Sequence, residues 1–211
     1  MRTVVVLAAG ADPPVAVSLP ADATVIAADG GADLARDLGL DVDLVVGDLD
    51  SVSAETLARI ERVERHAVAK DATDLDLALS AASRFEPDRI LVVGGAGGRL
   101  DHLLGGLLLL AADSFAGVRV DAQIGVAAVH VIRGERTLIG EPGELISLLA
   151  VHGPASGVVT EGLVYPLRGE ALEPGSTRGI SNVFAACEAR VALEAGVLLA
   201  VRPTGSATAG S

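Results

Sequence analysis

The stretch Thr24-Val25-Ile26-Ala27-Ala28-Asp29-Gly30-Gly31 shows the pattern that decides the fold: a continuous apolar run that ends in an acidic residue and two glycines. Similar runs occupy residues 4–7, 44–46, 63–69 and 90–93, of which 63–69 is the weakest. Unbroken apolar runs are typical of strands that are buried on both faces, as in parallel sheets covered by helices. The first part of the chain is therefore expected to contain such a sheet.

The chain is expected to form two domains. Segments with helical character separate the apolar runs, at residues 32–38, 53–63, 74–84 and 102–112. This alternation predicts an α/β domain with a mostly parallel sheet over residues 1–120. Beyond residue 120 short strands are expected at 126–131, 136–139, 145–151, 157–160 and twice within 185–201, without a helix of ten or more residues. The second part, residues 121–211, is therefore predicted to be an all-β sandwich.

The charge and composition of the 211 residues exclude several classes of protein. Half of the residues are apolar, which excludes a disordered chain. Sixteen Lys and Arg against 28 Asp and Glu give a net charge of −12. Nucleic-acid binding depends on a basic surface, so no nucleic-acid partner is expected.

Cysteine content and hydropathy bear on the location of the protein. A single Cys187 excludes an internal disulfide and a cysteine-based zinc site, which fits a reducing compartment. The apolar runs are shorter than the roughly 18 residues of a membrane span, and the N-terminus does not resemble a signal peptide. A cytoplasmic protein without a membrane partner is expected.

Acidic residues recur where the predicted strands end. Asp29, Asp48 and Asp71 each follow such a strand, and Asp50 lies two residues after Asp48. Each of them alone has an ordinary interpretation near a helix N-terminus, where Asp71 or Thr73 would act as a cap. Together they are expected at one edge of the sheet, where open parallel sheets bind ligands. Clustered carboxylates without Cys or His favour Mg²⁺.

A glycine-rich loop, Gly94 to Gly98, precedes the sequence Arg99-Leu100-Asp101-His102. Taken alone it is weak evidence of phosphate binding. It matches neither the P-loop nor the dinucleotide-binding fingerprint. Its interpretation depends on the motifs around it.

Five motifs in order make the chain resemble the thiamine pyrophosphokinase family over about residues 28 to 184. They are Ala28-Asp29-Gly30-Gly31-Ala32, Val46-Gly47-Asp48-Leu49-Asp50-Ser51, Lys70-Asp71-Ala72-Thr73-Asp74, Gly97-Gly98-Arg99-Leu100-Asp101-His102, and Gly179-Ile180-Ser181-Asn182 preceded by Gly162-Leu163-Val164-Tyr165-Pro166-Leu167. The resemblance implies an α/β domain that binds ATP and Mg²⁺, a thiamine-binding β-sandwich, and a homodimer with thiamine pockets between its subunits. It also implies transfer of a pyrophosphoryl group from ATP to the thiamine hydroxyl, with release of AMP.

The resemblance also implies roles for individual residues. It makes Asp48, Asp50 and Asp71 the Mg²⁺ ligands and, with Asp29, the catalytic carboxylates. The nucleotide would be bound by Gly97, Gly98, Arg99, Asp101, His102, Thr73 and Asp74. Thiamine would be bound by Ser181, Asn182 and Phe184.

The thiamine end departs from the family pattern. Val183 follows Asn182 where the family often has an acidic residue or Thr. The next residue, Phe184, is the only aromatic residue of this segment that could stack on thiamine. Phe184 either packs on thiamine or fills the core of the sandwich.

Three other functions remain open at this point. A related pyrophosphokinase would act on another alcohol, such as a hydroxymethylpterin, although the Gly-Ile-Ser-Asn segment favours thiamine. Asp48-Leu49-Asp50-Ser51-Val52 also resembles the nucleophile motif of Asp-x-Asp phosphatases, but that motif usually follows the first strand and here follows the third. A non-catalytic binding module would not need the acidic clusters.

Overall fold

The computed structural model describes residues 1–14, 17–67, 71–94 and 96–204. The chain divides into two compact units, one of residues 1–109 and 118–125 and one of residues 110–117 and 126–211. We call them the N-terminal unit and the C-terminal unit. The domain boundary at residue 120 stays a prediction.

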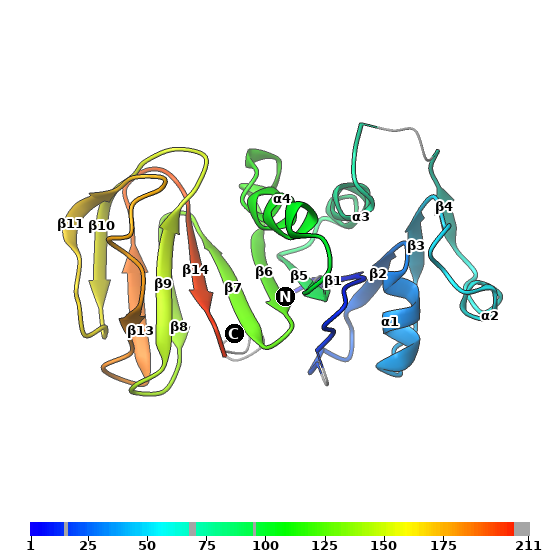
Figure 1. Ribbon diagram of the computed structural model, residues 1–211, viewed down its shortest axis with the longest axis horizontal. Coiled ribbons are helices and arrows are strands. Elements are labelled where there is room, and N and C mark those ends of the chain that lie inside the picture. The colour runs from blue at the N-terminus through cyan, green and yellow to red at the C-terminus, as the bar shows by residue number, and fades with distance from the viewer. Residues whose placement is uncertain (15–16, 68–70, 95, 205–211) are drawn as a thin grey trace. The chain divides into compact units, whose positions relative to one another are not determined.

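The N-terminal unit contains a parallel sheet (Figure 1). Its strands are β1 (Thr3–Ala8), β2 (Thr24–Ala28), β3 (Leu44–Gly47), β4 (Val63–Arg65), β5 (Arg89–Gly94) and β6 (Arg119–Ile124). They are hydrogen-bonded in the order β6-β5-β1-β2-β3-β4, and every neighbouring pair is parallel. Strands β2, β3 and β4 lie on one side of β1, and the chain then crosses to β5 on its other side. Such a reversal of strand order marks the usual ligand site of an open sheet.

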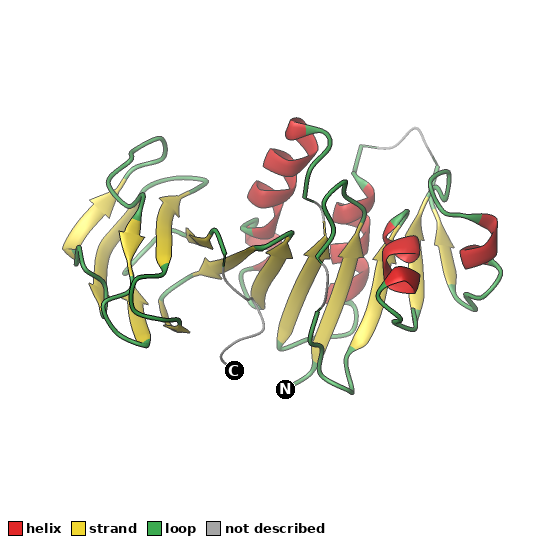
Figure 2. Cartoon of the chain, turned by 60° about the horizontal axis from the view of Figure 1, so that its bottom comes forward, coloured by secondary structure: helices red, strands yellow, loops and turns green. Residues whose placement is uncertain are grey.

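Helices cover both faces of this sheet (Figure 2). They are α1 (Gly31–Asp37), α2 (Ala54–Leu57), α3 (Asp74–Ser83) and α4 (Leu100–Leu110), the last of which is followed by a 3₁₀ turn at Asp113–Phe115. α1 and α2 lie on one face, and α3 and α4 lie on the other. The buried side of α3 consists of Ala78, Leu79, Ala81 and Ala82. These mostly small side chains let the helix pack closely on β1, β2 and β3.

In the N-terminal unit, three elements differ from the sequence-based prediction. The helix expected at 53–63 is the single turn of α2, and the strand expected at 63–69 ends at Arg65, with residues 68–70 outside the described residues. Strand β6 was not predicted at all. Its Asp121 is fully buried and accepts a hydrogen bond from Arg89 Nε at 2.8 Å, so a charged pair interrupts the apolar pattern of this strand.

The C-terminal unit is a β-sandwich, as predicted. Its strands are β7 (Ala127–Ile132), β8 (Glu135–Ile139), β9 (Leu145–Ala150), β10 (Ala155–Glu161), β11 (Arg168–Leu172), β12 (Asn182–Val183), β13 (Glu188–Ala192) and β14 (Leu198–Arg202). The orders β12-β9-β14-β7 and β11-β10-β13-β8 are antiparallel, and alternating residues of both groups form one apolar core. The two groups thus pack face to face.

No helix in the described part of the chain is both long and apolar enough to cross a membrane.

Candidate metal and nucleotide site

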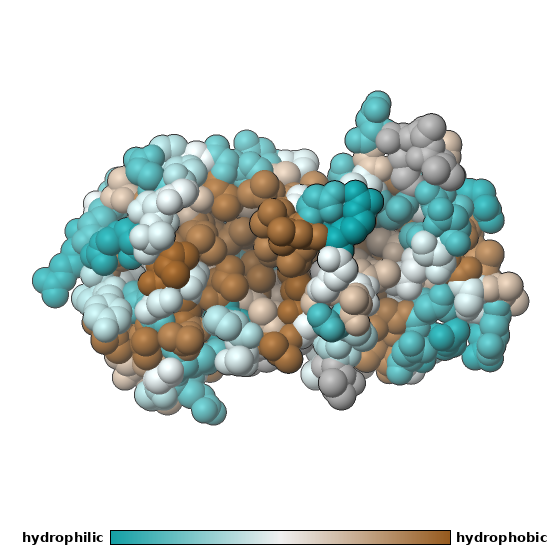
Figure 3. Space-filling model, viewed as in Figure 1, coloured by the Kyte–Doolittle hydropathy of each residue, from teal (hydrophilic) through white to brown (hydrophobic). Residues whose placement is uncertain are grey.

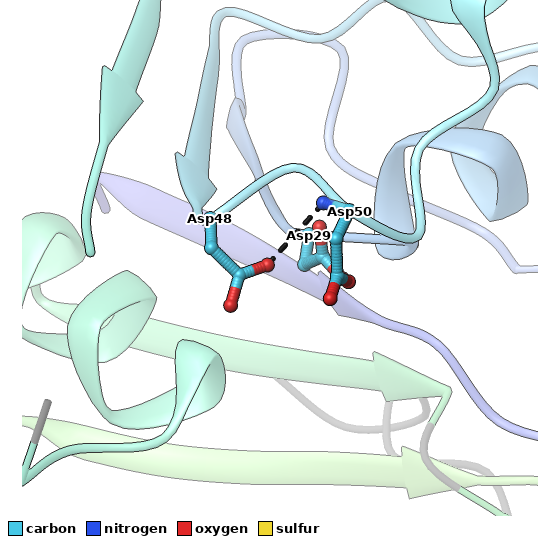
Figure 4. A group of neighbouring side chains, drawn as sticks. All are labelled: Asp29, Asp48 and Asp50. Atoms are coloured by element: carbon cyan, nitrogen blue, oxygen red, sulfur yellow. Dashed lines mark hydrogen bonds between the residues drawn. The ribbon is translucent and has the colours of Figure 1, made fainter. Parts of the chain in front are cut away.

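Three of the sequence-predicted carboxylates meet at the carboxyl edge of the parallel sheet. Asp29 follows β2 and Asp48 follows β3, and the backbone amide of Asp29 donates a hydrogen bond to Val46 O within β3 at 2.9 Å. One carboxylate oxygen from each of Asp29, Asp48 and Asp50 lies within 4.8 Å of the other two. Figure 4 shows the three side chains next to each other beyond these strand ends. The expectation that they converge follows from the common direction of the strands.

The loop after β3 presents its two carboxylates because the residue between them is buried. Leu49 packs in a cluster with Ala27 of β2 and Ala32 of α1, and its backbone adopts φ +68°. This conformation is rare for a leucine, and the buried side chain maintains it. Asp48 and Asp50 flank Leu49, and the Asp50 amide donates to Asp48 Oδ1 at 3.3 Å.

Asp29 is the buried member of the group. The residue is 9% exposed, its φ is +44°, and its Oδ1 has no hydrogen-bond partner among the described residues. A buried carboxylate oxygen without a donor is unfavourable unless a cation satisfies it. Three carboxylates within ligand distance of one another are hard oxygen donors of the kind that Mg²⁺ prefers. The residues present therefore fit this ion.

Asp74 adjoins the same group across Gly47. A β-carbon built on Gly47 would lie 2.9 Å from Asp74 Oδ1 and 3.1 Å from the β-carbon of Asp29. The φ of Gly47 is +150°, which side chains rarely adopt. Glycine at this position therefore lets the start of α3 approach the end of β2. The structure thereby brings Asp74 to the acidic edge.

Asp71 and Thr73 lie just before α3. Asp71 is exposed and is not part of the group of three carboxylates among the described residues. The Thr73 hydroxyl caps α3 by accepting a hydrogen bond from Asp76 N at 3.3 Å. Lys70, which begins this motif, lies outside the described residues. The metal-ligand role of Asp71 stays a prediction.

The glycine-rich loop after β5 lies near the reversal of strand order. Gly97 and Gly98 have φ values of +74° and +73°, and Ala96 O accepts a hydrogen bond from Asp12 N, after β1, at 3.0 Å. Arg99 Nη2 contacts Asp101 Oδ2 at 2.6 Å, and both side chains are exposed. This hydrogen bond lowers the pKa of Asp101 to about 2. His102 is exposed on the first turn of α4.

The three residues expected to bind thiamine differ in accessibility. Ser181 is exposed, with φ +57°. Asn182 is buried: its Oδ1 accepts from Tyr165 N at 3.0 Å, and its Nδ2 donates to Tyr165 O at 2.7 Å. Phe184 is 1% exposed in the sandwich core, with the Arg202 guanidinium 5.5 Å from its ring centre. The structure thus places the ring of Phe184 in the core, the second of its two expected positions.

Arg65 is a neighbour of the site that sequence reasoning missed. Its Nη1 donates to Asp48 O at 3.4 Å, and the next residue, His66, donates its backbone amide to Gly47 O at 2.8 Å. The end of β4 therefore supports the loop that carries Asp48. An isolated arginine within a weakly predicted strand gave no signal in the sequence.

Comparison with known proteins identifies the family. One family model, the catalytic domain of thiamin pyrophosphokinase, matches residues 18–120, and another, its vitamin B1 binding domain, matches residues 129–198. A thiamine pyrophosphokinase of Bacillus subtilis (strain 168) is 30% identical over an alignment of 193 residues that covers 85% of this chain and 86% of that protein. The chain belongs to the thiamine pyrophosphokinase family.

Solved structures of thiamine pyrophosphokinases have the same fold. The Bacillus subtilis protein matches with a TM-score of 0.84 at 26% identity, covering 96% of this chain and 99% of that chain. A thiamin pyrophosphokinase family protein from Enterococcus faecalis matches with a TM-score of 0.79 at 27% identity, covering 96% and 98%. The predicted family, fold and enzyme class are therefore confirmed. The hydroxymethylpterin and phosphatase alternatives are not favoured.

Proposed function

We propose that this member of the thiamine pyrophosphokinase family transfers the pyrophosphoryl group of ATP to the hydroxyl of thiamine, forming thiamine diphosphate and AMP. The observation that carries the proposal is the group of Asp29, Asp48 and Asp50 at the carboxyl edge of the sheet. It lies in the part of the chain that matches the family's catalytic domain. Asp71 is retained as a further metal ligand, as the motif implies.

The chemistry requires the negative charge of the phosphates to be neutralised while the attacking hydroxyl oxygen and the leaving phosphate oxygen are held in line with the phosphorus. Bound Mg²⁺ would neutralise charge on the phosphate oxygens, and Asp29, Asp48 and Asp50 would hold it. The exposed Arg99 and the amides of Gly97 and Gly98 would contact the phosphates. Asp101 and His102 at the start of α4, with Thr73 and Asp74 at the start of α3, would line the nucleotide site.

The C-terminal unit is proposed to bind thiamine, since the vitamin B1 binding model matches residues 129–198. Ser181 is exposed and can offer its hydroxyl to the ligand. Asn182 would act by holding the Tyr165 backbone in place. Thiamine is a cation, and the net charge of −12 favours its approach.

A homodimer is proposed as the working form. Figure 3 shows apolar residues gathered over β9, β14 and β7 of the C-terminal unit, where Leu145 is 46% exposed. In the N-terminal unit, Leu100, Leu104 and Leu108 form an exposed stripe on α4. Exposed apolar surface of this kind marks interaction sites. Sedimentation at assay concentration tests the dimer, and an active monomer would refute it.

The cytoplasmic location stays a prediction.

Thiamine-dependent nucleotide turnover tests the proposed reaction. The protein is incubated with ATP and Mg²⁺, together with thiamine, a hydroxymethylpterin or no alcohol. AMP formation is expected only with thiamine. AMP formation with the pterin alone would support the other pyrophosphokinase, and free phosphate without any alcohol would indicate a hydrolase.

A further inference from the structure

Asp33, in the first turn of α1, binds the start of α2. One carboxylate oxygen of Asp33 accepts a hydrogen bond from the Ser53 hydroxyl at 2.6 Å and another from the Thr56 hydroxyl. The other oxygen accepts from the Ser53 backbone amide at 2.9 Å. Thr56 is buried, and the side chain of Asp33 is 24% exposed. The two helices are therefore joined by polar contacts shielded from much of the solvent.

These contacts join the two loops that carry the clustered carboxylates. Asp33 comes four residues after Asp29, and Ser53 comes three residues after Asp50. Ser53 also caps α2 by accepting a hydrogen bond from the Thr56 amide at 3.3 Å, which fixes where the second loop ends. The loops touch as well, since a β-carbon built on Gly30 would lie 3.5 Å from Ser51 O.

The Asp33 carboxylate is ionised and partnered in this arrangement. Arg36 Nη1 lies 3.0 Å from Asp33 Oδ1 and also donates to the hydroxyls of Ser53, at 3.2 Å, and Thr56, at 3.0 Å. Burial opposes ionisation, but the hydrogen bonds from Ser53 and Thr56, with the charge of Arg36, lower the pKa of Asp33 below its ordinary value. An anion held by four groups from two helices resists displacement.

We propose that Asp33 is a positioning residue for the metal site: through Ser53 and Thr56 it holds the Asp29 turn and the Asp48–Asp50 loop at the separation that lets their carboxylates bind one ion. The inference rests on the proposed metal site. The ligands come from two separate loops, so their separation depends on contacts between those loops. Outer contacts that orient the ligands commonly change metal affinity by about 10- to 100-fold.

Mn²⁺ binding without nucleotide tests this role independently of catalysis. Free Mn²⁺ is measured by electron paramagnetic resonance as it is titrated into each variant. Asp33→Ala is expected to weaken binding about tenfold or more. Asp33→Asn keeps an acceptor for the Ser53 amide but turns an NH2 group toward Arg36, so binding between that of the wild type and that of Asp33→Ala is expected. Glu55→Ala, which removes an exposed carboxylate from α2, is the matched control and should leave binding unchanged.

The outcomes separate this inference from the metal site itself. If Asp33→Ala has a native circular dichroism spectrum and binds Mn²⁺ as tightly as the wild type, the positioning role is overturned and the metal site is not. A wild-type protein that binds no Mn²⁺ would overturn the metal site and the inference together. If Asp33→Ala does not fold, Thr56→Val decides, since it removes one hydroxyl bond to Asp33 at nearly constant volume. About threefold weaker binding by Thr56→Val supports the proposal, and unchanged binding refutes it.

Discussion

Asp29 and Asp48 follow adjacent parallel strands, and an oxygen of each carboxylate lies within 4.8 Å of the other. Two anions at this separation repel each other, and the buried position of Asp29 strengthens that repulsion. Neither sheet formation nor helix capping requires the pair. A bound divalent cation would compensate for this repulsion, as proposed for Mg²⁺ at this site.

Asp50→Asn should abolish most of the activity without destabilising the chain. Loss of one carboxylate weakens metal-assisted charge neutralisation, and about a 100-fold fall in kcat is expected. The melting temperature without ligand should stay constant or rise, because one of three like charges is gone. Steady-state kinetics at saturating Mg²⁺ and calorimetry measure the two effects. Asp41→Asn, an exposed acid away from the motifs, is the control. Near wild-type turnover of Asp50→Asn would exclude it as a ligand.

Asp71→Asn should separate metal binding from catalysis. Asp71 lies outside the group of three carboxylates in the described structure, so Mn²⁺ affinity without nucleotide should stay within about twofold of wild type. Activity should nevertheless fall about tenfold or more, as expected of a ligand recruited with the triphosphate. Titration of Mn²⁺ with and without an ATP analogue measures the difference. Wild-type kinetics in this variant would remove Asp71 from the site.

The fold was predictable wherever a strand is buried on both faces and therefore appears in the sequence as an unbroken apolar run. The runs ending at Ala28 and Val46 identify β2 and β3 because both faces of each strand are buried. Strand β6 escaped prediction because Arg119 and Asp121 interrupt its apolar pattern. Asp121 is buried beside two guanidinium groups, Arg89 of β5 at 2.8 Å and Arg119 at 3.4 Å, and the pairing with Arg89 is a property of the tertiary structure.

The site was predictable at the strand ends and less so elsewhere. Strand direction alone brings Asp29 and Asp48 together, as the sequence indicated. The role of Asp33 depends on Ser53, twenty residues away, and no local pattern reports that contact. The position of Phe184 depends likewise on how its segment packs in the sandwich. That packing decides whether the ring lies in the core or contacts a ligand, and the sequence does not show it.

Ser181→Ala and Asn182→Ala should affect thiamine use in different ways. Ser181 is exposed, so its alanine variant should raise the KM for thiamine and leave the melting temperature unchanged. Asn182 satisfies both backbone groups of Tyr165, so its alanine variant should also lower the free energy of unfolding by about 1–3 kcal/mol. The KM for ATP should not change in either. A change confined to the KM for ATP would contradict the assignment of thiamine to the C-terminal unit.

Phe184→Leu should affect stability and not substrate binding. The ring is buried among core residues beneath Arg202, so the smaller side chain should lower the free energy of unfolding by about 1 kcal/mol. Denaturant unfolding measures this loss. A raised KM for thiamine with unchanged stability would show instead that the ring contacts the substrate.

The stabilisation from Asp33 should depend on pH. Its pKa is lower in the folded chain than the ordinary value of 3.8, so the ionised form stabilises the fold. That contribution is complete well above the ordinary value and is lost as the pH falls through the lower, folded pKa. The wild type should therefore melt at a higher temperature than Asp33→Asn near neutral pH, and the difference in melting temperature should narrow as the pH falls below 3.8. A difference that is constant with pH would contradict the assignment.

The fate of the two terminal phosphates of ATP tests the central claim most directly. Reactions with thiamine and Mg²⁺ are run in parallel with ATP labelled with ³²P at the β or the γ position, and the thiamine products are separated. Transfer of the whole pyrophosphoryl group predicts that both labels appear in thiamine diphosphate, in equal amounts, with AMP as the other product. Transfer of the γ label alone, with ADP formed, would contradict the account.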